Sequence, residues 1–173
     1  MQTFLDVKLN KDITKALNEL GFIKPTPIQS KTIPLLMESD QDLIGSAQTG
    51  TGKTAAFGIP SIHLTDLADK KTQTLILCPT RELCMQITSD LKKYAKYVNK
   101  IGIVPVYGGT RIETQIRALN RGAQIVIGTP GRTKDLIKRK KLLLGRVERV
   151  VLDEADEMLS MGFKEDLDFI LSK

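Results

Sequence analysis

A glycine-rich segment between an apolar run and a helical pattern constrains the fold of this 173-residue chain more than any other feature. The segment is Ala47-Gln48-Thr49-Gly50-Thr51-Gly52-Lys53-Thr54; Asp42-Leu43-Ile44-Gly45 precedes it and Ala55-Ala56-Phe57 follows it. Glycines allow successive backbone N–H groups to face one phosphate, and the start of a helix adds partial positive charge. The order strand, loop, helix therefore predicts a phosphate-binding loop, in which Lys53 reaches the β- and γ-phosphates and Thr54 coordinates magnesium.

The loop departs from the strict phosphate-loop pattern at one position, because Ala47 stands where that pattern has a glycine. Ala47 then needs an ordinary backbone conformation, which a variant loop can provide. A glycine-rich turn that merely joins a strand to a helix is the structural alternative. A second feature directed at phosphate or metal is needed to decide between the two interpretations.

An acidic pair supplies that second feature. Asp153 and Glu154 follow the apolar run Arg149-Val150-Val151-Leu152, and ligands of open α/β sheets bind at the carboxyl ends of the strands. A carboxylate at Asp153 can hold magnesium, and Glu154 can orient and deprotonate an attacking water. Acidic residues after a strand also serve as helix N-caps. Together with the phosphate-binding loop, however, the pair favours nucleotide hydrolysis with Lys53, Asp153 and Glu154 as catalytic residues.

Five short β-rich runs alternate with helical patterns along the chain. The predicted strands cover 42–45, 74–78, 101–106, 124–127 and 149–153, and most are apolar throughout. Strands of that kind are buried on both faces, so we predict an α/β fold with a mostly parallel sheet and helices on both faces. Predicted helices cover 10–20, 81–98 and 112–119; another opens at Thr26-Pro27 and is kinked or ended by Pro34, and an amphipathic helix lies within 154–173.

Basic residues are concentrated in one part of the sequence. The net charge is +6, and the stretch from Arg111 to Val150 holds 11 Lys and Arg residues against three acidic ones, so the remainder is slightly acidic. This distribution suits a surface that binds a polyanion. A solvated helix face and a basic loop at 138–141 explain the charge equally well.

The composition argues against a membrane or disulfide-rich protein. No apolar run approaches the ~18 residues that span a bilayer, and the first residues do not form a signal peptide. Cys78 and Cys84 lie among apolar neighbours and lack metal-ligand spacing, so we predict buried, reduced thiols. We therefore expect no membrane partner and a cytoplasmic location.

Taken in order, these pieces resemble the first RecA-like domain of the DEAD-box ATP-dependent RNA helicases, which has a P-loop NTPase fold. The resemblance covers nearly the whole chain and six motifs: the Q motif at 21–29, motif I at 47–54 (where Ala47 is the family's normal residue), motif Ia at 79–83, Gly108-Gly109, motif Ib at 129–132, and motif II at 153–156. It implies one RecA-like domain over 1–173, with a Q-motif region at 1–37 and a P-loop core at 38–173. The short segment before Phe4 and the compact motif spacing suggest a bacterial member.

The resemblance implies that the chain binds ATP with Mg²⁺. Gln29 would offer an acceptor and a donor side by side to the adenine edge, which favours ATP over GTP, and Phe4 would stack on the base with Lys24 nearby. The phosphates would lie against Ala47, Gln48, Thr49, Gly50, Thr51, Gly52, Lys53 and Thr54, with Thr54 and Asp153 as the magnesium ligands. A helix-surface position for Gln29 and a core position for Phe4 are the structural alternatives.

RNA binding is also implied, through loops that follow predicted strands. The residues concerned are Thr80, Arg81, Gly108, Gly109, Thr129 and Arg132. Backbone N–H groups and the two arginines would grip successive phosphates of one strand, with little sequence specificity. A plain turn at Gly108-Gly109 and an exposed helix-start residue at Arg132 are the alternatives. Asp156 is expected to couple this domain to the rest of the enzyme through the family's Ser-Ala-Thr motif.

The Ser-Ala-Thr motif and the family's second RecA-like domain do not occur in this sequence, so we expect a fragment that is nearly inactive alone. In the full protein, ATP hydrolysis would be coupled to local unwinding of an RNA duplex. Two other classes stay open. One is a catalytically silent nucleotide or RNA clamp, against which the intact Lys53, Thr54, Asp153 and Glu154 argue. The other is a DNA-directed or different P-loop enzyme, including a small-molecule kinase.

Overall fold

The computed structural model describes residues 3, 4, 6–48 and 50–173. The chain divides into two compact units, and each is described by itself. The helical unit comprises Met1–Leu64 and Asp90–Asn99, and the sheet unit comprises Thr65–Ser89 and Lys100–Lys173. One helix, α4 (Arg81–Tyr94), contributes to both.

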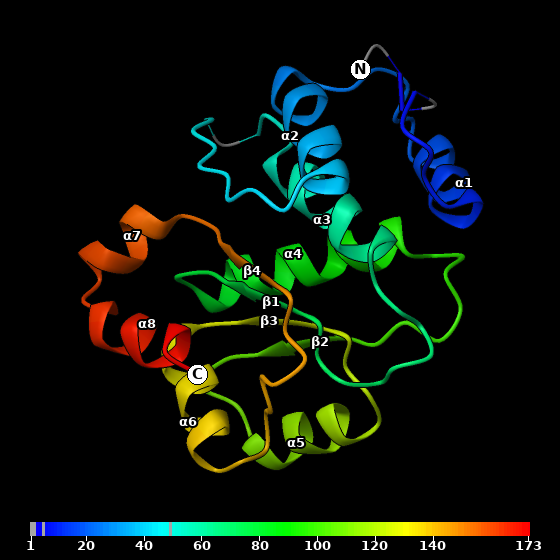
Figure 1. The fold of residues 1–173 in the computed structure, drawn as a ribbon. Coiled ribbons are helices and arrows are strands. Elements are labelled where there is room, and N and C mark those ends of the chain that lie inside the picture. The colour runs from blue at the N-terminus through cyan, green and yellow to red at the C-terminus, as the bar shows by residue number, and fades with distance from the viewer. Residues whose placement is uncertain (1–2, 5, 49) are drawn as a thin grey trace. The chain divides into compact units, whose positions relative to one another are not determined.

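The helical unit is built from α1 (Lys11–Glu19), α2 (Pro27–Glu38), α3 (Lys53–His63) and the end of α4. Helix α1 begins where predicted, because the Asn10 side chain accepts a hydrogen bond from the Asp12 N–H at 2.9 Å and so caps the first turn. Helices α2 and α3 lie side by side (Figure 1). On α3, a Cβ atom at Gly58 would lie 2.7 Å from a methyl carbon of Leu91, so glycine lets α3 and α4 approach closely.

Two expectations for this unit need correction. Of the two effects predicted for Pro34, an end of the helix does not occur: α2 continues to Glu38, because proline removes only its own N–H bond and the next turn closes normally with Ser39 N–H on the Leu35 carbonyl at 3.0 Å. A kink at Pro34 stays a prediction. Residues 42–45 do not form a strand; Leu43 is largely exposed and Ile44 wholly so. An apolar run becomes a strand only when a neighbouring strand completes its backbone hydrogen bonds, and 42–45 have no such neighbour among the described residues.

The sheet unit contains four parallel strands in the order β2-β3-β1-β4, as predicted for an α/β fold. They are β1 (Thr74–Leu77), β2 (Ile103–Val106), β3 (Ile125–Gly128) and β4 (Arg149–Leu152). Since all four run in one direction, their carboxyl ends lie at a common edge, with Leu77, Val106, Gly128 and Leu152 in register. This edge is called the carboxyl edge below, and the opposite one the amino edge.

Helices flank the sheet, which confirms the predicted layers. In Figure 1, α5 (Ile112–Asn120) and α6 (Pro130–Lys138) lie below the sheet and the beginning of α4 lies above it. Alternate strand residues such as Leu75, Val104 and Val126 share one apolar core with buried side chains of the helices. That core also receives side chains from α7 (Ala155–Ser160) and α8 (Lys164–Leu171). The predicted helix over 81–98 ends earlier, at Tyr94.

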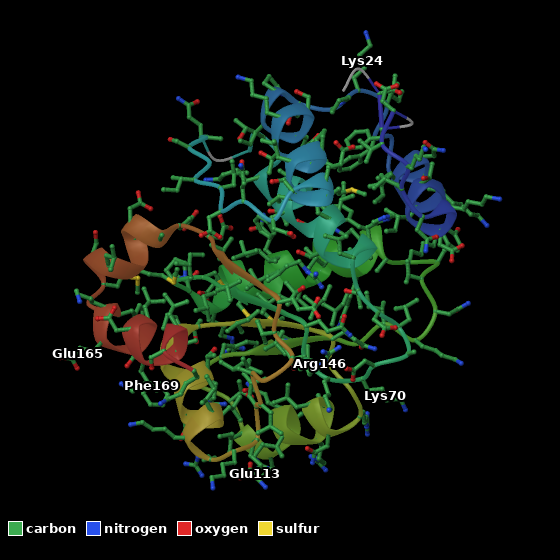
Figure 2. The ribbon with its side chains drawn as sticks, viewed as in Figure 1. Lys24, Lys70, Glu113, Arg146, Glu165 and Phe169 are labelled. Atoms are coloured by element: carbon green, nitrogen blue, oxygen red, sulfur yellow. The ribbon has the colours of Figure 1, made fainter. Side chains whose placement is uncertain are left out.

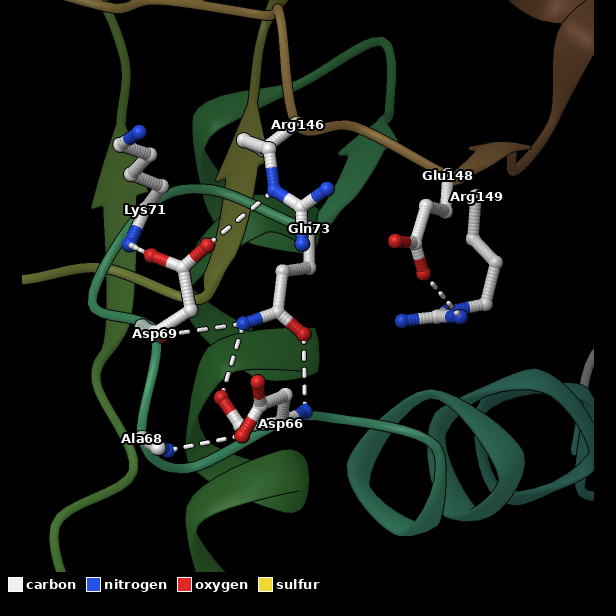
Figure 3. Close-up of polar contacts among 8 residues, drawn as sticks. All are labelled: Asp66, Ala68, Asp69, Lys71, Gln73, Arg146, Glu148 and Arg149. Carbon is white, nitrogen blue, oxygen red and sulfur yellow. Dashed lines mark hydrogen bonds and ion pairs between the residues drawn. The ribbon is translucent and has the colours of Figure 1, made fainter.

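A buried glutamine organises the amino edge (Figure 3). Gln73 accepts a hydrogen bond from Asp66 N–H at 2.8 Å and donates to the Asp66 and Asp69 carbonyls at 2.8 and 3.0 Å. Asp69 in turn accepts from Lys71 N–H and pairs with Arg146 at 3.1 Å. These bonds fix the loop 65–73, which directly precedes β1. Nearby, buried Gln124 accepts from Gly102 N–H at 2.8 Å and sets the start of β3.

Both cysteines are buried and neither forms a disulfide, which confirms the prediction for Cys78 and Cys84. Among the described residues, no helix is long and apolar enough to cross a membrane.

Candidate functional site

The phosphate-binding loop lies in the helical unit, directly before α3. Gly50 and Gly52 have φ angles of 80° and 89°, a conformation that costs little only for glycine. A Cβ atom on Gly52 would also lie 2.2 Å from Gln29 Nε2. Both the left-handed backbone and the lack of space therefore exclude a side chain at this position. Lys53 and Thr54 are the first two residues of α3, where unpaired N–H groups and the helix dipole favour an anion.

The rest of the loop is held by its own bonds. Thr51 Oγ1 donates to the Gln48 carbonyl at 2.6 Å, and Ala56 N–H donates to the Gly52 carbonyl at 3.2 Å. Ala47 is half-buried and Gln48 is exposed. Thr49 lies outside the described residues. The described part of the loop thus has the glycine conformations and the helix start that phosphate binding requires.

Gln29 is buried and engages the loop directly. Its Nε2 donates to the Gly52 carbonyl at 3.1 Å, and its Oε1 accepts from Thr26 N–H at 3.0 Å. The Thr26 hydroxyl oxygen beside it is buried and has no hydrogen-bond partner among the described residues. In this arrangement Gln29 joins the start of α2 to the last glycine of the loop, and its role in reading adenine stays a prediction.

The other two residues expected near the base differ in their exposure. Phe4 is buried and packs edge-to-face on Phe22, with ring centroids 5.7 Å apart, and Phe22 packs in the same way on Tyr94. Lys24 is exposed and extends away from the ribbon (Figure 2). Phe4 therefore occupies a small aromatic cluster of the helical unit, and stacking of Phe4 on adenine remains untested.

In the sheet unit, the acidic pair follows β4 as predicted. Asp153 N–H donates to the Leu77 carbonyl at 2.9 Å, which extends the β1–β4 ladder and fixes this residue at the carboxyl edge. Glu154 has φ 55° and ψ 50°, a left-handed conformation that is uncommon outside glycine, and it directly precedes α7 as its N-cap residue. Asp156 is exposed in the first turn of that helix. The chain therefore turns sharply at Glu154 and holds its backbone under strain.

Cys78 directly follows β1, within electrostatic range of this acidic pair. Its hydrogen bond with the Cys84 thiol raises the pKa of Cys78 most, burial raises it further, and the charges of Asp153 and Glu154 act in the same direction. Cys78 therefore stays a neutral thiol at physiological pH. It is a poor nucleophile and a poor metal ligand in that form.

The residues expected to bind RNA lie together at the carboxyl edge of the sheet unit. Thr80 and Arg81 follow β1, Gly108 and Gly109 follow β2, and Thr129 and Arg132 follow β3. The Arg81 guanidinium lies over the Tyr107 ring, 5.0 Å from its centroid. A Cβ atom on Gly109 would lie 3.9 Å from Arg81 Nη1, so the loops after β1 and β2 meet.

Thr80 and Thr129 both stand at helix starts. Thr80 Oγ1 accepts from Leu83 N–H at 3.2 Å, while Thr129 precedes Pro130, the first residue of α6. Helix starts present backbone N–H groups to the same edge, as a phosphate-binding surface needs.

Sequence reasoning missed two residues that hold this edge together. Gln115 on α5 donates to the Tyr107 carbonyl at 3.0 Å and accepts from Arg132 Nη1 at 3.0 Å. Arg132 Nη2 donates to the Thr110 carbonyl at 3.2 Å. The signal for Gln115 was a polar residue among the inward-facing positions Ile112, Ile116 and Leu119; nothing in the sequence singled out Tyr107.

The predicted magnesium ligands have suitable chemistry. Thr54 offers a hydroxyl oxygen and Asp153 a carboxylate oxygen, both on half-buried residues, and Mg²⁺ prefers oxygen ligands. No group of three or more His, Cys, Asp or Glu residues in the described ranges forms a self-contained metal site.

Comparison with known proteins agrees with these features. Residues 26–173 match the family model of the DEAD/DEAH box helicases. The ATP-dependent RNA helicase CshA of Listeria monocytogenes is 51% identical over 173 residues, which is 100% of this chain and 33% of that protein. The ATP-dependent RNA helicase DeaD of Buchnera aphidicola is 50% identical over 171 residues, which is 99% of this chain and 28% of that protein. The chain therefore spans a third or less of these two bacterial relatives.

Solved structures give the same result for the fold. A DEAD box protein from the hyperthermophile Methanococcus jannaschii superimposes with a TM-score of 0.94 and 42% identity, covering 99% of this chain and 47% of that one. A hypothetical ATP-dependent RNA helicase from Sulfolobus tokodaii gives a TM-score of 0.86 and 39% identity, over 95% and 47% of the two chains. The predicted RecA-like fold is confirmed.

Proposed function

Because the chain belongs to the DEAD/DEAH box helicase family, we propose that residues 1–173 form one RecA-like domain that binds ATP and RNA in an ATP-dependent RNA helicase. The observation that carries this proposal is the carboxyl edge of the sheet unit. There Arg81 lies over Tyr107 and Arg132 bonds to Gln115 and to the Thr110 carbonyl, and neither arginine is paired with a carboxylate among the described residues. Cations that are held in place but not neutralised suit the phosphates of a nucleic acid.

The phosphate-binding loop would hold the nucleotide. Backbone N–H groups of the loop and the start of α3 would contact the phosphates, and Lys53 would place its ammonium group against the β- and γ-phosphates. Gln29, with Phe4 and Lys24, would select adenine. Gln29 already contacts the loop through the Gly52 carbonyl, so nucleotide binding and base selection would be linked.

Hydrolysis would depend on the acidic pair after β4. Thr54 and Asp153 would hold Mg²⁺, which when bound neutralises charge that develops on the phosphates. Glu154 would orient and deprotonate the attacking water. The left-handed backbone of Glu154 supports this role, since strain of this kind is retained at functional positions.

RNA would bind along the carboxyl edge through its sugar-phosphate backbone. Thr80, Arg81, Gly108, Gly109, Thr129 and Arg132 would contact successive phosphates of one strand. The lack of aromatic side chains among them supports contact with the backbone rather than with stacked bases, and backbone contacts carry little sequence information. In the full-length protein a second RecA-like domain would complete the ATP site, and Asp156 would couple the two. A cytoplasmic location fits two buried, reduced cysteines.

The test compares the full-length protein with the chain of residues 1–173. For the full-length protein we expect ATPase activity that requires RNA and unwinding of a short RNA duplex, both with ATP and not with GTP. For residues 1–173 we expect weak ATP binding and turnover at least tenfold below that of the full-length protein. A full-length protein that hydrolyses ATP equally fast with and without RNA would refute the proposed function.

A further inference from the structure

Gln115 occupies an unusual position for a polar side chain. It lies on the inward face of α5 with 6% of its surface exposed, between Ile112 and Leu119. A buried amide costs free energy unless its donor and acceptor are both satisfied. Both are satisfied here, because Nε2 donates to the Tyr107 carbonyl and Oε1 accepts from Arg132 Nη1, each at 3.0 Å.

The two bonds fix the orientation of the amide. Its donor meets a carbonyl that can only accept, and its acceptor meets a guanidinium that can only donate, so a flipped amide would lose both bonds. Gln115 therefore connects the loop after β2 with the start of α6, which follows β3.

Arg132 is held without losing its charge. It uses one N–H group on Gln115 and one on the Thr110 carbonyl, and both partners are neutral. A guanidinium has five N–H groups, so three are left for another acceptor. Its side chain is half-buried, which limits its freedom and reduces the entropy lost when a phosphate binds.

The same glutamine acts on Arg81 through Tyr107. Gln115 holds the backbone carbonyl of Tyr107, and the ring of Tyr107 lies against the Arg81 guanidinium at 5.0 Å. An aromatic face attracts a cation without neutralising it. One buried side chain thus links both arginines of the carboxyl edge.

We propose that Gln115 is the positioning residue for RNA binding, which holds Arg81 and Arg132 in place to contact phosphates of one RNA strand, with Tyr107 as its intermediary. This inference rests on the proposed function. Other buried glutamines of the sheet unit behave differently. Within the described part of the chain, the side chains of Gln73 and Gln124 bond to backbone groups at the amino edge, whereas Gln115 bonds to a charged side chain.

Gln115→Met in the full-length protein tests the proposal, with Gln124→Met as the matched control. Each variant removes one buried amide with little change in volume. For Gln115→Met we expect the KM for RNA in the ATPase assay to rise about tenfold while kcat at saturating RNA changes less than twofold. The salt dependence of RNA affinity should become shallower by about 0.7 in log–log slope, which corresponds to one lost phosphate contact on a single strand.

Gln124→Met separates positioning from stability. It should lower the thermal midpoint at least as much as Gln115→Met and leave the KM for RNA within twofold of the wild type. Equal increases in KM for the two variants, or no increase for Gln115→Met, would overturn the proposal and leave the proposed function standing. A wild-type protein that binds no RNA would instead refute the proposed function itself.

A second pair of variants tests the link to Arg81 and applies even where Gln115→Met fails to fold. Tyr107→Leu removes the aromatic face under Arg81, whereas Tyr107→Phe keeps it. We expect the KM for RNA to rise several-fold for Tyr107→Leu and to stay within twofold for Tyr107→Phe. The same KM for both variants would contradict a positioning role for Tyr107.

Discussion

The two edges of the sheet are built alike and differ in what happens to their charges. Each edge has a buried glutamine that bonds to a loop, Gln73 at the amino edge and Gln115 at the carboxyl edge, and each has an arginine close by. At the amino edge, Asp69 neutralises Arg146. At the carboxyl edge, Arg132 bonds to an amide and a carbonyl, which orient its guanidinium and leave its charge intact.

This difference is the one expected between an edge that only stabilises the fold and the edge proposed to bind RNA. An arginine paired with a carboxylate has little left to offer an anionic ligand, whereas one held by neutral partners keeps its full attraction for phosphate. Neutral partners also limit the movement of the side chain before a ligand arrives. Polar contacts that orient an arginine without neutralising it therefore support the proposal that RNA binds at the carboxyl edge.

The largest expected effect is on ATP turnover, and it should differ between the two ends of β4. Glu154 follows the strand, and Glu148, which pairs with Arg149, precedes it. Glu154→Gln in the full-length protein should lower RNA-stimulated ATP turnover by roughly 10²–10⁴-fold, because a general base is lost. Glu148→Gln, the same chemical change at the amino edge, should alter turnover less than twofold. Turnover of Glu154→Gln above a tenth of the wild-type value would exclude Glu154 as the base.

The next effect concerns the two arginines. Arg132→Met in the full-length protein should weaken RNA binding about tenfold or more, since a hydrogen bond to a charged group contributes ~1.5–3 kcal/mol. Arg146→Met should leave RNA affinity within twofold, because Asp69 already occupies Arg146. Binding to a fluorescent single-stranded RNA measures both. Equal losses would mean that both edges attract RNA only through net charge, and the contrast between them would disappear.

Much of this contrast could be predicted from the sequence. Parallel strands place their carboxyl ends at one edge, so apolar runs followed by Thr80-Arg81, Gly108-Gly109 and Thr129 predicted loops that lie together. The left-handed backbone of the predicted phosphate-binding loop could be predicted for a similar reason, because Gly50 and Gly52 are the residues that adopt it at little cost. These features depend on local chain geometry, which residue type and spacing determine.

Features that depend on tertiary partners were not predictable. The run 42–45 has the composition of a strand, but strand formation depends on a neighbour that composition does not reveal. Gln29 was expected to face adenine, and its bond to the Gly52 carbonyl depends on the approach of α2 to the loop. Gln115 and Tyr107 were missed because their roles arise from contacts between loops distant in sequence.

A smaller effect tests the backbone strain at Glu154 by comparing glycine with alanine at this position. Alanine is usually the more stable of the two, and the strain should reverse that order. The left-handed backbone there costs an alanine about 1–2 kcal/mol more than a glycine. Glu154→Gly should therefore unfold with a higher free energy than Glu154→Ala in urea titrations of the 173-residue chain. At Glu148, whose φ is not positive, the order should be opposite by about 0.5–1 kcal/mol, since glycine gains entropy on unfolding. Alanine more stable at both positions would show that the turn at Glu154 relaxes without cost.

The smallest effect concerns pH at the amino edge. The N–H of Lys71 lowers the pKa of Asp69 most, and Arg146 lowers it further, from a usual value of 3.8. A carboxylate whose pKa is lowered by folding stabilises the folded state above its unfolded pKa, and that contribution is lost as pH falls through the folded pKa. The thermal midpoint of the wild type should therefore exceed that of Asp69→Asn at pH 7. The difference should shrink as the pH falls below 3.8 and vanish once the pH is below the folded pKa.

Repeating the comparison of wild type with Asp69→Asn in the Arg146→Met background shows whether Lys71 N–H or Arg146 lowers the pKa of Asp69 more. Since the backbone N–H of Lys71 is the larger cause, most of the pH-dependent difference that Asp69→Asn produces should survive in that background. Complete loss would make the ion pair with Arg146 the dominant contact. Charge rather than backbone hydrogen bonding would then hold the loop 65–73, and the stability of the amino edge would depend on ionic strength, as we expect of RNA binding at the carboxyl edge.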